Sequence, residues 1–408
     1  MIRKAFFIIT TVIMIVAVFT GLVSALDVHT STVVKANLEN VRSVATAAHV
    51  TGVNYAIDNG QLFAGRPGEW RQVATPEGVI VGAVALDTAR PEVVYIGAAN
   101  EMAIYRSTER GNGWMRVPLS DDYVGGVTSL AVDSAGRILY AGTDTAGVFR
   151  LRDVGSSVIA GGQMALDVPV LQVAADTTGA GLAFVRTAMD LYRAENGGLN
   201  WAKVENLGSA PTALAIANRY PATVYVGTAD RGVVTSHDGL NWELANDGMG
   251  MLPGTRLFVD ALAVDPAQLD VLYAAVSYVS GTTQVHAAPV GVTMSTDGAA
   301  TWSGLSPNIA DRVAELLPVA GNTGAVYALT TTSRTPQAVG QAPVLNEAVA
   351  VAAEQPANTV PLSSALAWIV AGLAGAALIF NLIYDAARRS KQVAMPTKMR
   401  PQTAGTLR

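Results

Sequence analysis

The chain has 408 residues, of which 50% are hydrophobic and only 14% are charged, and its mean hydropathy is +0.32. This composition is too apolar for an ordinary soluble protein and directs attention to membrane segments. The net charge of −5 argues against a nucleic-acid-binding surface, which needs basic residues, and the absence of cysteine excludes disulfides, thiolate metal sites and thiol catalysis.

The first predicted element is an uncharged run over residues 5–26, preceded by Arg3 and Lys4. As a helix it is long enough to cross the ~30 Å of hydrocarbon in a bilayer. The small residues of Val23-Ser24-Ala25 also fit a cleavage site. Residues 1–26 are therefore a signal anchor or a signal peptide, and both place the following chain outside the cytoplasmic membrane.

A linker is predicted over residues 27–52. Its apolar residues Val34, Leu38, Val41 and Val44 have the spacing of one helical face. The linker is therefore expected to form a short amphipathic helix.

Short Val- and Ala-rich strands, separated by Gly, Asp-Gly, Asn-Gly and Pro, fill residues 53–332. A strand centred on an aromatic residue recurs about every 40 to 55 residues, and another apolar strand precedes it each time. Such a period is typical of the four-stranded blades of a β-propeller. The aromatic residues are Tyr95, Tyr140, Phe184, Tyr225, Tyr273 and Tyr327.

A tryptophan-ended turn follows four of these strands and is the second repeated feature. Its marker residues are Ser107, Glu109, Gly111 and Trp114; Asn196, Gly198 and Trp201; Ser236, Asp238 and Trp242; and Ser295, Asp297 and Trp302. The turns resemble the Asp-box, Ser-x-Asp-x-Gly-x-Thr-Trp, of the BNR-repeat β-propeller family, although Glu109 and Asn196 depart from it. The resemblance implies a structural role: the acid or Asn bonds backbone amides, Gly supplies positive φ, and Trp packs between blades.

The number of blades follows from the incomplete units. Residues 313–330 supply two strands without a tryptophan turn, and residues 61–64 and 70–73 form an unassigned pair ahead of the first full unit. Joining these halves gives an all-β, six-bladed propeller of antiparallel blades with no exposed sheet edges. A seven-bladed propeller, with a blade built partly from residues 155–166 or 345–353, is the alternative.

The C-terminal part is predicted to be a membrane anchor. An Ala- and Pro-rich stalk over residues 333–361 leads to an apolar transmembrane helix over 362–384 and a basic tail over 385–408. Basic residues after a membrane helix favour the cytoplasmic side. We therefore predict a protein of the cytoplasmic (inner) membrane, with its propeller on the extracytoplasmic or periplasmic side.

Asp-box propellers include sialidases, so the resemblance raises the question of catalytic residues. The resemblance implies a need for an arginine cluster, an acid and a tyrosine nucleophile, and no such set is recognisable. Strand-end aspartates are explained by backbone capping, and the four histidines have no metal-ligand spacing. The aspartates are Asp58, Asp87, Asp133, Asp176 and Asp265. We predict no enzyme and no catalytic, cofactor or metal site; a carbohydrate-binding or sialidase-like glycoside hydrolase propeller is the alternative.

Two long insertions, residues 246–257 and 277–289, are predicted to rise side by side from one face of the propeller. Their apolar residues suggest a partner-binding surface. The candidates are Met249, Met251, Leu252, Phe258, Tyr278 and Val279. The overall arrangement is similar to Ycf48-like photosystem II assembly factors and to sortilin-like propellers, which bind proteins or peptides. The resemblance implies a protein-interaction or assembly module whose partner is another membrane or extracytoplasmic protein.

Overall fold

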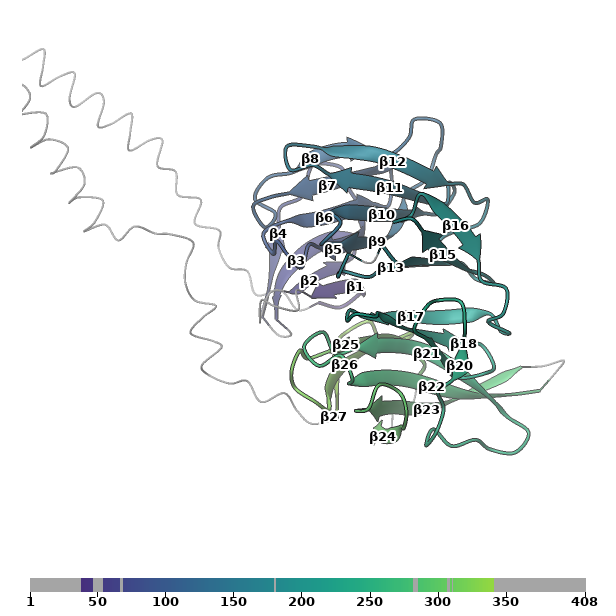
Figure 1. The fold of residues 1–408 in the computed structure, drawn as a ribbon. Coiled ribbons are helices and arrows are strands. Elements are labelled where there is room, and N and C mark those ends of the chain that lie inside the picture. The colour runs from purple at the N-terminus through teal and green to yellow at the C-terminus, as the bar shows by residue number, and fades with distance from the viewer. Residues whose placement is uncertain are drawn as a thin grey trace, which may run out of the picture. The chain divides into compact units, whose positions relative to one another are not determined.

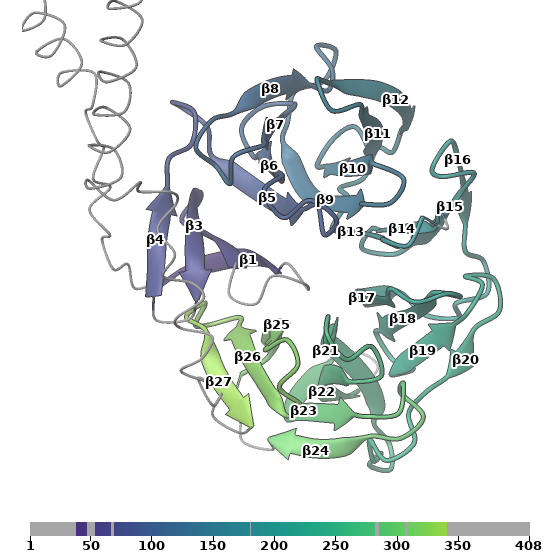
Figure 2. The ribbon, with the colours of Figure 1, turned by 60° about the vertical axis from the view of Figure 1, so that its left-hand side comes forward.

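A computed structural model of the chain describes residues 38–340, except 47–53, 67–68, 180, 282–284, 307–308 and 310. The described residues form seven antiparallel sheets that follow one another along the sequence. The sheets are arranged as blades around a ring (Figures 1 and 2). The predicted all-β propeller of four-stranded antiparallel blades is thus confirmed.

Six blades have four strands and the seventh has three. Blades 1 to 4 contain β1 (Val41–Thr46), β2 (Asn54–Asp58), β3 (Gln61–Arg66) and β4 (Glu69–Val73); β5 (Val81–Leu86), β6 (Val94–Ala98), β7 (Ala103–Ser107) and β8 (Met115–Pro118); β9 (Val127–Asp133), β10 (Ile138–Thr143), β11 (Val148–Asp153) and β12 (Val158–Met164); and β13 (Gln172–Ala175), β14 (Ala183–Arg186), β15 (Leu191–Glu195) and β16 (Asn200–Lys203). Blades 5 to 7 contain β17 (Pro211–Ala217), β18 (Thr223–Thr228), β19 (Val233–Ser236) and β20 (Glu243–Leu244); β21 (Arg256–Val264), β22 (Leu272–Ser280), β23 (His286–Ser295) and β24 (Ser303–Ser306); and β25 (Val313–Pro318), β26 (Ala325–Thr330) and β27 (Gln337–Gly340).

The six-blade prediction is wrong, and the seven-bladed alternative is the observed fold. The error lies in blade 1, because the aromatic-centred strand around Tyr55 was not counted as a repeat. Tyr55 stands in the second strand of its blade, as Tyr95 and Tyr140 do in theirs. Residues 61–66 and 69–73 therefore complete blade 1 instead of joining β25 and β26, and residues 158–164 form the fourth strand of blade 3.

The predicted helical linker is also corrected by β1. Residues 41–46 pair with 54–58 as a strand, so the apolar spacing reflects packing and not a helix face. Leu38 and Val41 are buried against Trp70 of blade 1 and Leu329 of blade 7. The propeller accordingly begins before residue 53, and it extends into the predicted stalk because residues 337–340 form β27.

Ring closure depends on packing and on one backbone contact, because blades 1 and 7 share no strand. The amide of Val41 donates to the Arg334 carbonyl (3.2 Å), next to a parallel bridge between Asn40 and Arg334. The amide of Val44 in β1 donates to a carboxylate oxygen of Glu315 in β25 (3.4 Å). These contacts join the two ends of the described chain.

Glycine in the second strands lets neighbouring blades approach closely. A Cβ built on Gly97 would lie 2.4 Å from Cγ1 of Val127, and one on Gly142 would lie 2.4 Å from Cγ1 of Val170. Real Cβ atoms do not approach so closely, so a larger residue would push the blades apart. The glycine two positions after Tyr95, Tyr140 and Tyr225 therefore makes room for the start of the next blade.

The tyrosines themselves connect consecutive blades. The hydroxyl of Tyr55 donates to the Arg110 carbonyl of blade 2, and that of Tyr225 donates to the Gly298 carbonyl of blade 6 (3.3 Å each). The hydroxyl of Tyr273 accepts a hydrogen bond from the amide of Gly324 in blade 7 (2.9 Å). Tyr55, Tyr225 and Tyr273 therefore each hold a turn of the following blade in place.

The predicted membrane segments, residues 5–26 and 362–384, lie outside the described part of the chain. Within the part that is described, no helix has the length and apolarity needed to cross a membrane.

Candidate functional site: a projecting hairpin and the adjacent loop

A long hairpin projects from blade 6. Strands β22 and β23 extend well past the other strands of the ring (Figure 1), and they pair from Leu272↔Ser295 to Ser280↔His286. The outer strand β24 pairs only with Val292, Thr293 and Met294. Residues 286–290 of β23 therefore have no paired outer neighbour among the described strands, and they offer backbone groups to a partner.

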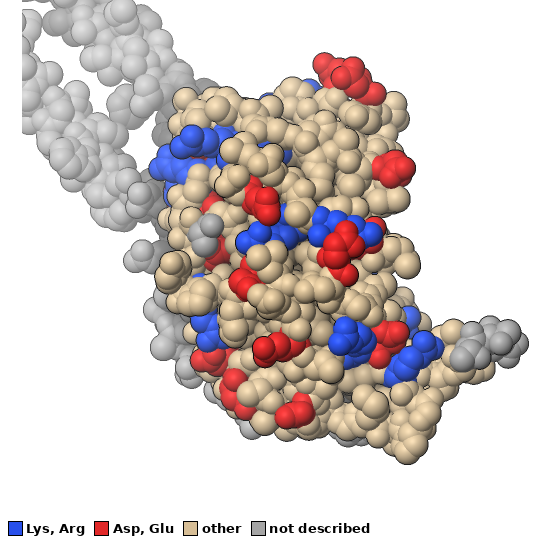
Figure 3. All heavy atoms as spheres, turned by 45° about the vertical axis from the view of Figure 1, so that its right-hand side comes forward, with Lys and Arg blue, Asp and Glu red and all other residues tan. Residues whose placement is uncertain are grey.

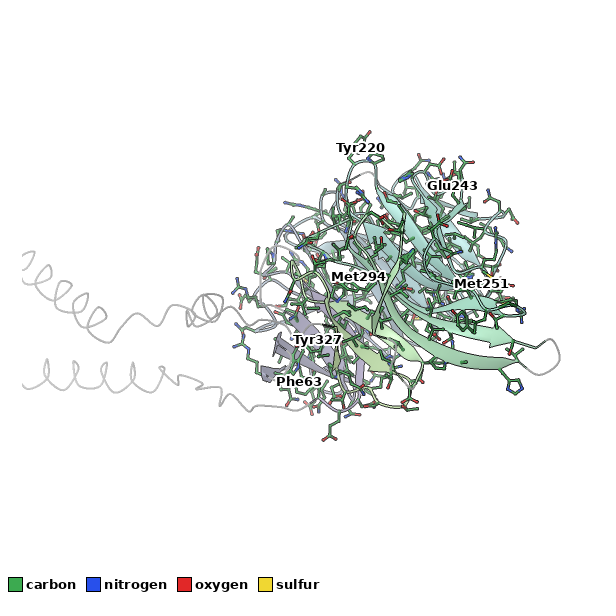
Figure 4. All side chains as sticks on the ribbon, turned by 90° about the horizontal axis from the view of Figure 1, so that it is seen from below. Phe63, Tyr220, Glu243, Met251, Met294 and Tyr327 are labelled. Atoms are coloured by element: carbon green, nitrogen blue, oxygen red, sulfur yellow. The ribbon has the colours of Figure 1, made fainter. Side chains whose placement is uncertain are left out.

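The loop before blade 6 lies against the base of this hairpin. A Cβ built on Gly250 would lie 3.5 Å from the Tyr278 hydroxyl, and Met249 packs in one cluster with Leu257 and Tyr278. Met251 stands beside the hairpin in Figure 4. The two insertions are thus adjacent, as expected, although residues 277–280 and 286–289 are paired strand and not loop.

The six candidate contact residues fall into two groups. Met251 and Leu252 are 64% and 53% exposed, which is unusual for large apolar side chains beside each other. Met249 and Val279 are buried, and Phe258 and Tyr278 are half-buried. The Arg312 guanidinium lies 4.5 Å from the centre of the Phe258 ring and covers it. Only Met251 and Leu252 are therefore free to contact a partner in the described structure.

We call Met251, Leu252, the exposed Val285 and the free edge of residues 286–290 the arm surface. It belongs to the face on which second strands end and blade-to-blade connections run. On the face shown in Figure 3, acidic and basic side chains are intermingled and uncharged residues cover most of the surface. We therefore expect a partner to bind the arm surface through apolar and backbone contacts more than through electrostatic attraction to charges of one sign.

The predicted Asp-box turns lie between third and fourth strands. The Ser295 hydroxyl accepts from the Ala299 amide (2.9 Å), and Asp297 accepts from the hydroxyl and the amide of Thr301 (2.6 and 2.9 Å). These bonds hold the pKa of Asp297 at about 2. Asp238 accepts from the amides of Asn241 and Leu240, which hold its pKa well below its usual range. Both carboxylates are thus occupied by their own turns.

The turn tryptophans contact the preceding blade. Nε1 of Trp114 donates to the Ala74 carbonyl, and Nε1 of Trp302 donates to the Ala245 carbonyl (2.8 Å each). Trp201 packs edge-on against Tyr140, with ring centres 5.8 Å apart. The indoles consequently serve inter-blade packing in this structure. The remaining box residues Ser107, Glu109, Gly111, Asn196, Gly198, Ser236 and Trp242 lie in or beside the corresponding turns of blades 2, 4 and 5.

Blade 3 has no tryptophan turn, and a buried charge cluster occupies the equivalent place. Asp153 is 1% exposed and accepts from Tyr95 (2.5 Å), Arg106 (2.9 Å) and Arg90 (3.1 Å). Burial alone would raise the pKa of Asp153, but these groups and the Gly155 amide outweigh it, so the pKa lies below its ordinary value. The cluster therefore connects blades 2 and 3 and leaves Asp153 no free acid function.

The strand-end aspartates are backbone caps. Asp87 accepts from the amides of Ala89 and Arg90, and Asp265 accepts from those of Ala267 and Gly321. Asp133 similarly accepts from the Gly136 amide. All three side chains are buried. No group of three potential metal ligands occurs in the part of the chain that the structure describes.

Two charged residues were not anticipated from the sequence. Arg186, at the end of β14, lies between blades 4 and 5, and Glu315 lies at the ring closure. Neither belongs to a recognisable motif. What distinguishes them is the neighbouring blade. Glu315 accepts a bond from the Val44 amide of blade 1, and Arg186 donates only to a carbonyl, that of Pro211, in blade 5.

Comparison with known proteins shows the fold. No family model matches the sequence, and no curated protein matches it. Solved structures that resemble it include a GH74 xyloglucanase from Xanthomonas campestris, with a TM-score of 0.53, 20% identity, and coverage of 73% of this chain and 52% of that chain. The chain thus spans about half the length of that enzyme.

Propellers from protein complexes give similar scores. YCF48 bound to a D1 peptide gives a TM-score of 0.53 at 12% identity, covering 75% of this chain and 93% of that chain. A chain of the mitotic checkpoint complex gives 0.51 at 11% identity, covering 75% and 89%. At these identities the resemblance establishes a β-propeller that is shared by protein-binding modules and glycoside hydrolases alike.

Proposed function

We propose that the protein is a membrane-anchored, extracytoplasmic propeller that binds another membrane or extracytoplasmic protein through the arm surface. The observation that carries the proposal is the projecting β22–β23 hairpin with a free strand edge beside exposed Met251 and Leu252. Free edges and adjacent apolar side chains are a recurrent mode of peptide recognition, in which the backbone gives affinity and side chains give specificity. The peptide complex of the YCF48 propeller supports a binding role for this fold.

The contact is tested by co-purification of the full-length chain from its native membranes in mild detergent. The double substitution Met251→Asp and Leu252→Asp should reduce partner recovery at least tenfold, because two carboxylates would be desolvated in an apolar contact. Leu199→Asp is the matched control, since Leu199 is 61% exposed on a different blade. Equal recovery with all three proteins would refute the contact.

Topology has a separate test. The chain contains no cysteine, so Leu240→Cys introduces a unique thiol at a residue that is 55% exposed on the propeller. A membrane-impermeant maleimide should label it in intact cells. Labelling only after lysis would place the propeller in the cytosol and contradict the proposal.

A carbohydrate-active function is the second candidate, favoured by the GH74 neighbours. Hydrolysis requires an acid and a base that are exposed to substrate. Asp87, Asp133, Asp153 and Asp265 are buried and bonded within the fold. Release of reducing sugar from xyloglucan by the purified chain, lost on substitution of an exposed carboxylate, would establish the enzyme in place of the binding module.

A further inference from the structure

Arg186 occupies the contact between blades 4 and 5. It pairs across the sheet with Gln172 on one side and with Leu191 on the other, so the three side chains share one face of blade 4. Leu191 packs with Leu207 and Leu214 toward blade 5. The Arg186 guanidinium therefore lies at the edge of an apolar inter-blade cluster.

The hydrogen bonds of Arg186 are few and long. Nε donates to Oε1 of Gln172 and Nη1 donates to the Pro211 carbonyl, each at 3.4 Å. Gln172 is itself held by a 2.8 Å bond from Nε2 to the Leu214 carbonyl of blade 5. Both hydrogens of Nη2 and one of Nη1 have no bonding partner among the described residues, and these are the donors that grip a carboxylate in a two-point contact.

Among the residues that the structure describes, no carboxylate forms an ion pair with Arg186. None of the ion pairs among the described residues includes Arg186, whereas Arg90 and Arg106 share Asp153 and Arg312 bonds Asp260. Burial lowers the pKa of Arg186 to about 10, so the group is still cationic at neutral pH. Arg186 is half-buried, so water solvates its guanidinium only in part, and a carboxylate ligand would supply the missing counter-charge.

The surroundings of Arg186 specify the ligand further. Exposed apolar side chains lie just before β13 and just after β14: Leu171 is 47% exposed and Met189 is 71% exposed. The connection between the blades carries Ser209, whose buried hydroxyl has no partner in the described structure. A ligand that combines a carboxylate with an apolar flank matches these groups.

We propose that the contact between blades 4 and 5 is a carboxylate-binding subsite in which Arg186 receives a carboxylate carried by a segment of the partner protein. The subsite lies on the face where second strands end, which is also the face of the arm surface. It rests on the proposed binding function and adds a chemical requirement to it. Apolar and backbone contacts at the arm would provide most of the contact area with the partner, and the ion pair between Arg186 and the carboxylate would fix the position of the partner segment.

The test uses the full-length protein in detergent and a tetrapeptide, Ala-Val-Leu-Ala, with a neutral fluorophore at its N-terminus. One version ends in a free carboxylate and the other in an amide, and the variant proteins measured in the same micelles control for the different partition of the two peptides. Fluorescence anisotropy should show at least tenfold tighter binding of the carboxylate version to the wild-type chain. Arg186→Gln should abolish that preference, and Arg256→Gln, which removes an exposed cation on the same face, should preserve it.

Three results would overturn the subsite: equal binding of both peptides to the wild type, an unchanged preference in Arg186→Gln, or an equal loss in Arg256→Gln. Full displacement by inorganic phosphate with higher affinity than the peptide would show a site for a free oxyanion instead. Should Arg186→Gln fail to fold, the wild-type comparison and Arg186→Lys still decide, because lysine keeps the charge but loses the two-point contact. Partner recovery that is lost in the Met251 and Leu252 variant but kept in Arg186→Gln would reject the subsite alone.

Discussion

Glu315 should make ring closure depend on pH. Its carboxylate accepts only a long hydrogen bond from the Val44 amide (3.4 Å), and burial raises its pKa to about 7 against the opposing effects of that amide and Arg334. The native state therefore holds a proton between about pH 4.5 and 7 that the unfolded chain has released. The free energy of unfolding must fall as pH rises through this interval.

The size of the effect follows from the pKa. A rise from 4.5 to about 7 corresponds to about 3 kcal/mol, because one pKa unit corresponds to about 1.4 kcal/mol. Partial contact of the side chain with solvent makes this an upper value. Glu315→Gln keeps the shape of the protonated carboxyl and removes its ionisation. The variant should exceed the wild type in stability by less than about 1 kcal/mol near pH 5 and by about 2 to 3 kcal/mol at pH 8.5.

The assay is denaturant unfolding of wild type and Glu315→Gln from pH 5 to 8.5. The quantity of interest is the stability difference between them, because all other titrating groups cancel in it. Glu243→Gln, at an exposed glutamate that Figure 4 labels, is the matched control. A flat difference for Glu315→Gln would show that the carboxyl is not enclosed at the junction of blades 1 and 7.

Two further predictions concern contacts between blades. Tyr273→Phe should lower the free energy of unfolding by about 1 kcal/mol, because the Gly324 amide loses its acceptor. Tyr140→Phe should be neutral, because the Tyr140 hydroxyl has no partner in the described structure. Thermal unfolding of both variants checks this, and equal losses of stability would contradict it. Asp153→Asn should destabilise by about 3 to 5 kcal/mol, since it leaves the buried Arg106 without its counter-ion. A loss below about 1 kcal/mol in denaturant unfolding would show that the charge cluster does not hold blades 2 and 3 together.

Most of the fold could be predicted from the repeated sequence pattern. An aromatic residue in the second strand recurs because each blade must pack against the next, and in blades 2, 3 and 5 a Gly follows it two residues later. Tyr55 has the same place in blade 1, forty or so residues before Tyr95, and counting it would have given seven blades. The helix expected in the linker over residues 27–52 is wrong in the part that the structure describes, because residues 41–46 form a strand and Leu38 and Val41 pack against blades 1 and 7.

The candidate site was harder to predict. The apolar content of residues 246–257 and 277–289 directed attention to the projecting hairpin and the adjacent loop, but it did not reveal that Met249 and Val279 are buried and that Arg312 covers Phe258. Strand pairing decides those exposures, and pairing is not local in sequence. Arg186 could not be singled out from the sequence for a related reason, because its lack of a counter-ion depends on which groups of blade 5 lie against it.

Photo-crosslinking from the arm tests the central claim most directly. A photoreactive amino acid is incorporated in place of Met251 or, as the control, Leu199, in the full-length chain in its native membrane. The account predicts a discrete protein adduct from position 251 that is absent from position 199. No adduct at position 251, or the same adduct from both positions, would contradict partner binding through the arm surface.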